Sequence, residues 1–124
     1  MPLSKFVRTR FVLAVPDAQA TARGWMEAMK FERQQDLDGW VFVSRGRCTV
    51  MLGSCTGIIP VRDLGDHSYF GYIEVDDIDA YRAEIDLPPG NLREPDDKPW
   101  GMREMAVRTP DGHRVTIGQA IPQA

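Results

Sequence analysis

The side chains best suited to chemistry in this chain are its two histidines, His67 and His113, and its two cysteines, Cys48 and Cys55. Two thiols seven residues apart match no zinc or redox motif, and two histidines without a third ligand make a poor catalytic metal centre. No serine lies in a nucleophile elbow or completes a Ser-His-Asp order. We therefore expect no catalytic residue and no metal ligand, and we expect both cysteines to be reduced thiols.

The bulk properties are those of one small globular domain. The 124 residues are 43% hydrophobic and 27% charged, which suits a single domain with its own core. The net charge of −3 argues against a nucleic-acid partner. Residues 1–60 carry 8 basic and 5 acidic side chains, a charge of +3, whereas residues 61–124 carry 7 and 13, a charge of −6 that we expect to be a solvated surface. No window reaches the roughly 18 apolar residues of a membrane span, and the N-terminus lacks a signal-peptide stretch, so we expect a cytoplasmic protein without a membrane partner.

The first half of the chain predicts a strand, a helix and a hairpin. Residues 11–15 form a short apolar run, and Asp17 after it is a helix N-cap. A helix is predicted over 18–29, and strands over 39–44 and 48–52. One apolar helix face, expected to lie in the core, consists of Ala22, Trp25, Met26 and Met29.

The second half repeats this order. A strand is predicted over 69–75, Asp77 caps a short helix after it, and strands follow over 102–108 and 114–117. Between the last two strands, Thr109-Pro110-Asp111-Gly112 is a strong turn signal.

The two halves align as an internal repeat. Val15-Pro16-Asp17 matches Val75-Asp76-Asp77, and Val50-Met51-Leu52-Gly53 matches Val115-Thr116-Ile117-Gly118. Such a repeat predicts an α+β fold with two βαβββ modules, at about residues 8–55 and 67–119, within a single domain over residues 1–124. Each sheet would have one face covered by its helix and one bare face. Two bare, curved faces brought together would form a cleft for a small ligand.

One stretch of the second half resembles a known family. It runs Pro99-Trp100-Gly101-Met102-Arg103-Glu104 and then Thr109-Pro110-Asp111-Gly112-His113-Arg114. Together with the doubled strand and capped helix, it resembles the vicinal oxygen chelate superfamily, which includes glyoxalase I, extradiol dioxygenases, fosfomycin-resistance proteins and bleomycin-resistance proteins. The resemblance covers about residues 8–119 and is closest to the bleomycin-resistance branch. It implies paired βαβββ modules (the glyoxalase/bleomycin-resistance fold) and, because members are commonly dimers, a homodimer.

The positions at which the resemblance implies a metal carry unsuitable side chains. Metal-using relatives place His, Gln or Glu near the start of the first strand of each module and near the end of its last strand. In this chain, local register puts Arg10, Met51, Phe70 and Thr116 at those positions. None of these is a normal ligand for a hard or borderline divalent ion. We therefore expect no cofactor, and the metal-dependent reactions of the family lose their Lewis acid.

Strand alternation predicts the lining of the cleft, because every second residue of a strand faces the same side. An aromatic and apolar lining with Arg10 at its floor suits a planar small organic ligand that carries an acceptor or a carboxylate. Alternatively, Met51, Phe70 and Tyr72 fill the core, and Trp100 anchors its loop. The expected ligand-binding residues are Arg10, Trp40, Met51, Phe70, Tyr72, Trp100, Glu104 and Thr116.

The sequence leaves three functions open. We favour a metal-free protein that sequesters an aromatic or drug-like molecule, as in antibiotic resistance. One alternative is a glyoxalase- or dioxygenase-like lyase whose metal is held elsewhere, through His67, Glu104 or His113. Another is a dimeric interaction protein with a cleft filled by its own side chains. A catalytic pair of Cys48 and His113, at equivalent positions of the repeat, is a further possibility.

Overall fold

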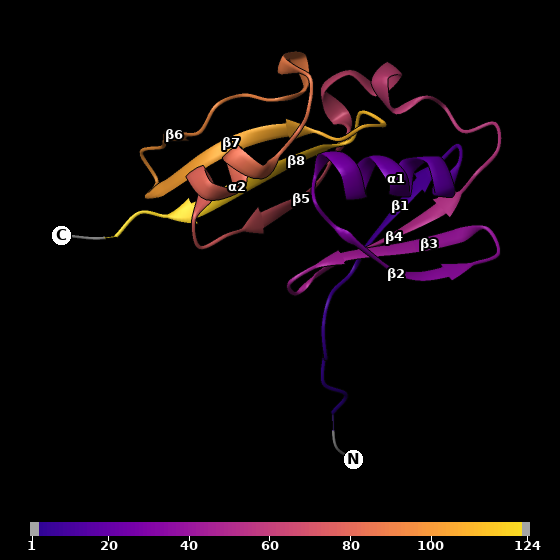
Figure 1. The fold of residues 1–124 in the computed structure, drawn as a ribbon. Helices are drawn as coiled ribbons and strands as arrows, with labels where there is room; N and C mark the ends of the chain where they lie inside the picture. The colour runs from indigo at the N-terminus through magenta and orange to yellow at the C-terminus, as the bar shows by residue number, and fades with distance from the viewer. Residues whose placement is uncertain (1–2, 123–124) are drawn as a thin grey trace.

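The computed structural model describes residues 3–122 and consists of two modules of the same construction (Figure 1). Module 1 contains β1 (Phe11–Val15), α1 (Ala18–Ala28), β2 (Glu32–Leu37), β3 (Trp40–Arg45) and β4 (Cys48–Ser54). Module 2 contains β5 (Tyr69–Glu74), α2 (Ile78–Glu84), β6 (Asp96–Asp97), β7 (Met102–Arg108) and β8 (Arg114–Ala120). Short 3-10 segments cover Val61–His67 and Pro89–Asn91. The predicted α+β fold with two βαβββ units is confirmed.

The two sheets have the same strand order. Module 1 forms a sheet in the order β1-β4-β3-β2, and module 2 forms one in the order β5-β8-β7-β6. In each, the first strand runs parallel to the last, and the remaining pairs are antiparallel. Val12 lies opposite Met51, and Tyr72 lies opposite Thr116, so strand pairing reproduces the equivalence of Met51 and Thr116 in the repeat.

Both helices begin at the predicted caps. The Asp17 carboxylate accepts hydrogen bonds from the backbone N–H groups of Gln19 and Ala20, at 3.0 and 3.3 Å, and Asp77 caps α2 in the same way. Trp25 on α1 is fully buried, and each helix lies over one face of its own sheet (Figure 1). No helix within residues 3–122 is long and apolar enough to cross a membrane.

Strand β2 has no apolar pattern that would predict it. Its sequence is Glu-Arg-Gln-Gln-Asp-Leu, and all six residues are exposed. It forms because it is the edge strand of its sheet and pairs on one side with β3. A polar edge of this kind discourages further strand pairing, so its composition reflects its position and not a buried face.

Each sheet has the predicted buried and bare faces, but one chain does not close the two bare faces around a cleft. The bare faces expose apolar side chains instead: Val12 is 59% exposed, Trp40 38% and Tyr72 44%. The sheets are separate four-stranded layers that lie side by side (Figure 1). The prediction of a cleft between the two bare faces is therefore wrong for a single chain, because the modules pack through their helices and hairpin turns.

The turn of module 2 packs against α1. The hydroxyl of Thr21 donates a hydrogen bond to the Asp111 carboxylate. Gly24 lies against the ring of Pro110, where a Cβ would come within 2.8 Å of Cγ. The predicted turn over residues 109–112 is therefore part of the junction between the modules.

The hairpin of module 1 makes the reciprocal contact with α2. Arg45 lies over the ring of Tyr81, 4.9 Å from the centroid, and pairs with Glu84 at 2.6 Å. The buried Tyr81 hydroxyl donates to the carbonyl oxygen of Met29 at 3.0 Å. Each hairpin turn thus holds the helix of the other module.

Candidate ligand-binding site

Three aromatic and acidic side chains form a hydrogen-bonded cluster on the bare face of module 2. The Glu104 carboxylate accepts hydrogen bonds from the Tyr72 hydroxyl and from the Trp100 indole N–H, both at 2.9 Å. Thr116 is paired with Tyr72 in the neighbouring strand and lies on the same face. Four of the expected ligand-binding residues are therefore brought together.

Two glycines position this cluster. Gly118 lies opposite Glu104 in the β7–β8 pair, and the Tyr72 phenol crosses it so closely that a Cβ would overlap the hydroxyl oxygen. Gly101 has φ of 87°, a conformation that L side chains rarely adopt, and its N–H donates to the Lys98 carbonyl. The resulting turn presents Trp100, which is 64% exposed.

The electrostatics of the cluster keep Tyr72 protonated. Partial burial against the sheet, the hydrogen bond to Glu104, and the charges of Glu104 and Glu74 together raise the pKa of Tyr72 to about 12. Tyr72 therefore remains a neutral hydrogen-bond donor well above physiological pH. The arrangement offers two aromatic surfaces beside a carboxylate, which suits a planar ligand with a donor or cationic group.

Two other expected residues belong to the bare face of the other sheet. Trp40 lies opposite Gly53 in the β3–β4 pair, and its ring covers that glycine. Met51, half-buried, lies opposite Phe42 on the same face. Within one chain, the bare face of module 1 is thus a separate surface from the Glu104 cluster.

Phe70 lies away from both sets of residues. The half-buried Phe70 ring packs 5.3 Å from the ring of Phe11 and 6.2 Å from that of Trp25, towards the core. Strict alternation would place Phe70 with Tyr72, but β5 has an irregularity between Tyr69 and Gly71. Arg10 is exposed and precedes the first residue of β1.

The residues present do not fit a bound divalent ion. Among the side chains that the structure describes, no three from His, Cys, Asp or Glu gather as a metal site requires. His67 is exposed at the end of a 3-10 segment, His113 is buried, and Glu104 accepts bonds from Tyr72 and Trp100. The displaced metal set considered for a lyase is therefore not assembled.

A cavity of about 550 Å³ lies where the modules meet, and it is lined by Cys48, Tyr72 and Tyr81 among others. Both cysteines are free thiols. Burial raises the pKa of the Cys48 thiol, which disfavours the nucleophilic thiolate. His113 does not line this cavity, and no hydrogen bond joins it to Cys48 among the described residues. The pairing of these two residues for catalysis has no geometric support.

His113 instead belongs to the module junction. Its ring meets the Phe70 ring edge-on, with centroids 6.1 Å apart. Its Nδ1 atom is buried and has no hydrogen-bond partner among residues 3–122. Burial lowers the pKa of His113 below the ordinary value of 6.5, against the opposing influence of Asp111 and a backbone hydrogen bond to Ala14.

We expect this buried histidine to make stability fall in mild acid. Because the folded state disfavours protonated His113, the unfolded chain binds more protons and stability rises with pH. The contribution of neutral His113 is complete above pH 6.5 and is lost as the pH falls through the lower folded-state pKa. Urea unfolding at pH 7.5 and 5.5 measures this loss of stability, which should be smaller in the His113→Gln variant than in the wild type. His67→Gln removes an exposed histidine, and an equal reduction by that variant would contradict the assignment.

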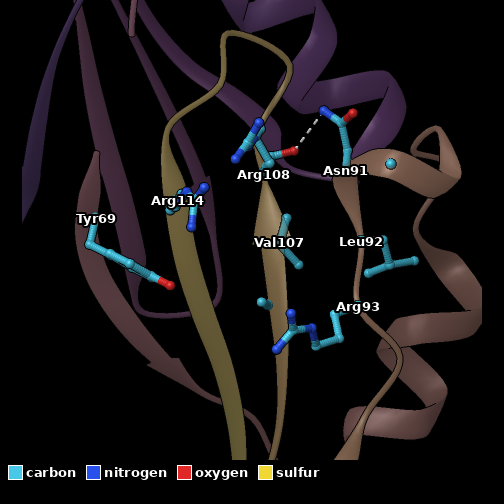
Figure 2. A pocket seen from close by; sticks show the side chains of 9 residues that line it. Tyr69, Asn91, Leu92, Arg93, Val107, Arg108 and Arg114 are labelled. Atoms are coloured by element: carbon cyan, nitrogen blue, oxygen red, sulfur yellow. Dashed lines mark hydrogen bonds between the residues drawn. The ribbon is translucent and has the colours of Figure 1, made fainter. Parts of the chain in front are cut away.

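A second cavity, of about 340 Å³, was not anticipated by sequence reasoning (Figure 2). It is lined by Tyr69, Arg93, Arg108 and Arg114, among others. Arg108 and Arg114 flank the predicted turn and lie directly opposite each other, a pairing that hairpin symmetry could have revealed. Arg93 could not have been found in this way, because it comes from a loop whose pairing with β7 is non-local.

The sequence of the chain matches a known family over most of its length. A sequence profile of the Glyoxalase/Bleomycin resistance protein/Dioxygenase superfamily matches residues 8–117. No curated protein sequence matches the chain significantly.

Three solved structures with the same fold are of proteins named for bleomycin resistance, bleomycin binding or antibiotic binding. A bleomycin resistance determinant encoded on transposon Tn5 is 18% identical, with a TM-score of 0.75 over 93% of this chain and 98% of that chain. A bleomycin-binding protein from Streptomyces verticillus, complexed with copper(II)-bleomycin, is 22% identical, with a TM-score of 0.71 over 98% and 100%. The antibiotic-binding protein TnmS3 from Streptomyces sp. CB03234 is 19% identical, with a TM-score of 0.68 over 94% and 99%. At these identities the likeness shows the fold.

Proposed function

Because this chain belongs to the Glyoxalase/Bleomycin resistance protein/Dioxygenase superfamily, we propose that it sequesters an aromatic or drug-like small molecule without a metal ion. The observation that carries the proposal is the exposed cluster of Tyr72, Trp100 and Glu104 on the bare face of module 2. Rigid aromatic side chains around a single polar group are typical of small-molecule sites.

The named functions of the structural neighbours support this class of ligand. One neighbour is a bleomycin-binding protein complexed with copper(II)-bleomycin, and another is an antibiotic-binding protein. Binding without a resident metal is supported by the side chains at the four positions where the resemblance implies a metal, Arg10, Met51, Phe70 and Thr116. A cytoplasmic location is part of the proposal and is supported by the two free cysteines.

The alternative of an interaction protein with a filled cleft has less support. Neither bare face is covered by other side chains of the described chain: Val12 is 59% exposed and Trp100 is 64% exposed. An apolar surface of this kind is typical of a ligand-binding or association face.

We further propose that the protein is a homodimer whose second copy covers the bare faces. Leu3, Phe6 and Val7 lie on an N-terminal segment that extends away from the modules, and each is at least 91% exposed (Figure 1). Burying these side chains and the bare faces against a second copy would remove apolar surface from water. A second copy would also supply the opposing wall that one chain lacks.

Ligand binding is tested by titrating the wild-type protein with a panel of aromatic compounds and antibiotics, followed by tryptophan fluorescence and melting temperature. We expect at least one compound to bind, and Glu104→Gln to weaken it about tenfold, since a hydrogen bond to a charged group contributes about 1.5–3 kcal/mol. The matched control is Glu32→Gln, an exposed carboxylate on edge strand β2. If no compound changes either signal, or if both variants bind alike, the proposal fails.

Elemental analysis accompanies the titration, and near-stoichiometric Zn, Ni, Fe or Mn would contradict binding without a metal.

The dimer is tested by light scattering at micromolar concentration. We expect the wild-type protein to have twice the mass of the chain and Val12→Glu to shift it towards the monomer, because a buried unpaired carboxylate is costly. The matched control is Ile59→Glu, which alters an aliphatic side chain that is 65% exposed in the connector between the modules. A wild-type monomer would contradict the proposal.

A further inference from the structure

The 340 Å³ cavity concentrates positive charge on the sheet of module 2. Arg93, Arg108 and Arg114 all line it, and no Asp or Glu is among its described lining residues. Figure 2 shows their side chains over the same face of β7 and β8, with Arg93 reaching across β7 from the neighbouring segment. This concentration stands out because residues 61–124 carry a net charge of −6.

Arg93 and Arg108 differ from the cations of module 2 that form ion pairs. Arg82 pairs with Glu94 at 2.7 Å, and Arg103 pairs with both Asp79 and Asp97, at 3.0 and 3.1 Å. Arg93 and Arg108, by contrast, form no ion pair with any side chain that the structure describes. Their guanidinium groups are therefore available to an anion from outside the chain.

The strand register places like charges directly opposite each other. Arg108 and Arg114 are paired residues of the antiparallel β7–β8 ladder. Like charges at directly opposed positions destabilise a sheet. An anion that binds between the two guanidinium groups would be attracted to both of them.

The frame of the cavity is held by backbone pairing. The Arg93 N–H donates to the Ala106 carbonyl at 2.9 Å, and Leu92 forms a bridge with Val107, so the segment with Arg93 lies along β7. The Asn91 side-chain amide donates to the Arg108 carbonyl at 3.1 Å (Figure 2). The arginines are thus attached to β7, β8 and a segment that pairs with β7. A backbone that is already ordered lowers the entropy cost of binding.

An aromatic ring completes the cavity. The Arg114 guanidinium lies over the ring of Tyr69, 5.6 Å from the centroid, in a cation–π contact. This contact orients the Arg114 guanidinium, and the Tyr69 ring is 56% exposed. Planar guanidinium groups bind carboxylate and phosphate oxygens through two parallel N–H bonds.

We propose that this cavity binds the oxyanion group, phosphoryl or carboxylate, of a small molecule, through Arg93, Arg108 and Arg114. Arg108 shares one face of β7 with Ala106 and Glu104, and Arg114 shares the same face of β8 with Thr116, so the cavity opens on the face of the Glu104 cluster. The inference deepens the proposed function, on which it rests for the rest of the ligand, by assigning that ligand an anionic group. Oxyanion binding itself is measured without that ligand.

The experiment is isothermal titration calorimetry with inorganic pyrophosphate in one arm and citrate in the other, in a chloride buffer free of phosphate, carboxylate and sulfonate. We expect one-to-one binding of at least one probe, and weaker binding as sodium chloride is added. Arg108→Gln and Arg93→Gln should each reduce the affinity at least tenfold. Arg108→Lys should recover part of it, because the charge is kept and the two-pronged geometry is lost.

The matched control is Arg23→Gln, which removes one exposed cation from α1. Binding of pyrophosphate alone identifies a phosphoryl site, and binding of citrate alone identifies a carboxylate site. No binding of either probe at low salt overturns the proposal, as does an equal loss in Arg23→Gln and both cavity variants. The aromatic titration with Glu104→Gln is independent, so either proposal can fail while the other holds.

Discussion

Replacing Trp25 with alanine is expected to lower the free energy of unfolding by about 3–5 kcal/mol, the largest effect of any single change considered. Trp25 is fully buried, and its ring packs 4.8 Å from that of Phe31 and 6.2 Å from that of Phe70. Phe70 belongs to module 2, so the indole contributes to the core of its own module and to the junction. Urea unfolding followed by circular dichroism measures the loss without depending on tryptophan fluorescence.

Trp25→Phe is the matched control. The indole Nε1 has no hydrogen-bond partner among residues 3–122, so phenylalanine keeps most of the apolar volume and gives up no hydrogen bond. We expect it to cost about 1.5 kcal/mol or less. Equal destabilisation by Ala and Phe would show that the site depends on the polar N–H and not on packing.

Gly71→Ala is expected to destabilise the protein by about 1–3 kcal/mol, the usual cost of overpacking. A Cβ at Gly71 would lie 2.6 Å from Cζ and 2.8 Å from Cε1 of the Phe11 ring. Phe11 pairs with Val50, and Gly71 pairs with Val115, so the two residues occupy equivalent positions of the repeat and meet at the junction. The Phe11 ring of module 1 occupies the space that a side chain at position 71 of module 2 would need.

One control variant and one double mutant test this prediction. Gly90→Ala adds a methyl group where nothing lies within 4 Å, and we expect a change within about 0.5 kcal/mol. Phe11→Leu should cost less in the Gly71→Ala background than in the wild type, because the two residues are in contact and their effects do not add. Additive effects in the double mutant, measured by urea unfolding, would exclude the proposed clash.

The junction explains why the bare faces remain open. Thr21 and Asp111 tie α1 to the turn of module 2, and Arg45 and Glu84 tie the turn of module 1 to α2. These contacts use the helices and hairpin ends, which leaves the opposite sheet faces to solvent. The aromatic cluster of Glu104 and the arginine-lined cavity are therefore presented on a surface that a second copy can cover.

The elements were the most predictable part of the structure, because their signals are local. The caps at Asp17 and Asp77, the apolar face with Trp25, and the turn at Thr109–Gly112 all act over a few residues. Strand β2 was missed because an edge strand that buries no face shows no apolar alternation.

The candidate site was only partly predictable. Glu104 and Thr116 lie on the regular strands β7 and β8, and the structure brings them together with Tyr72. The position of Phe70 could not be predicted from alternation. A shift of one residue reverses the face of a strand, and the irregularity between Tyr69 and Gly71 turns the Phe70 side chain towards the core.

The sequence by itself determined the repeated βαβββ architecture, its resemblance to the superfamily, and the chemical identity of the side chains at the positions where that resemblance implies a metal. These are properties of local pattern and residue type. Only the tertiary structure decided that the modules join through their turns and helices, that the bare faces stay open within one chain, and that Arg93 joins Arg108 and Arg114 around one cavity. The physical reason is that such contacts depend on packing between segments far apart in the chain, which no local periodicity encodes.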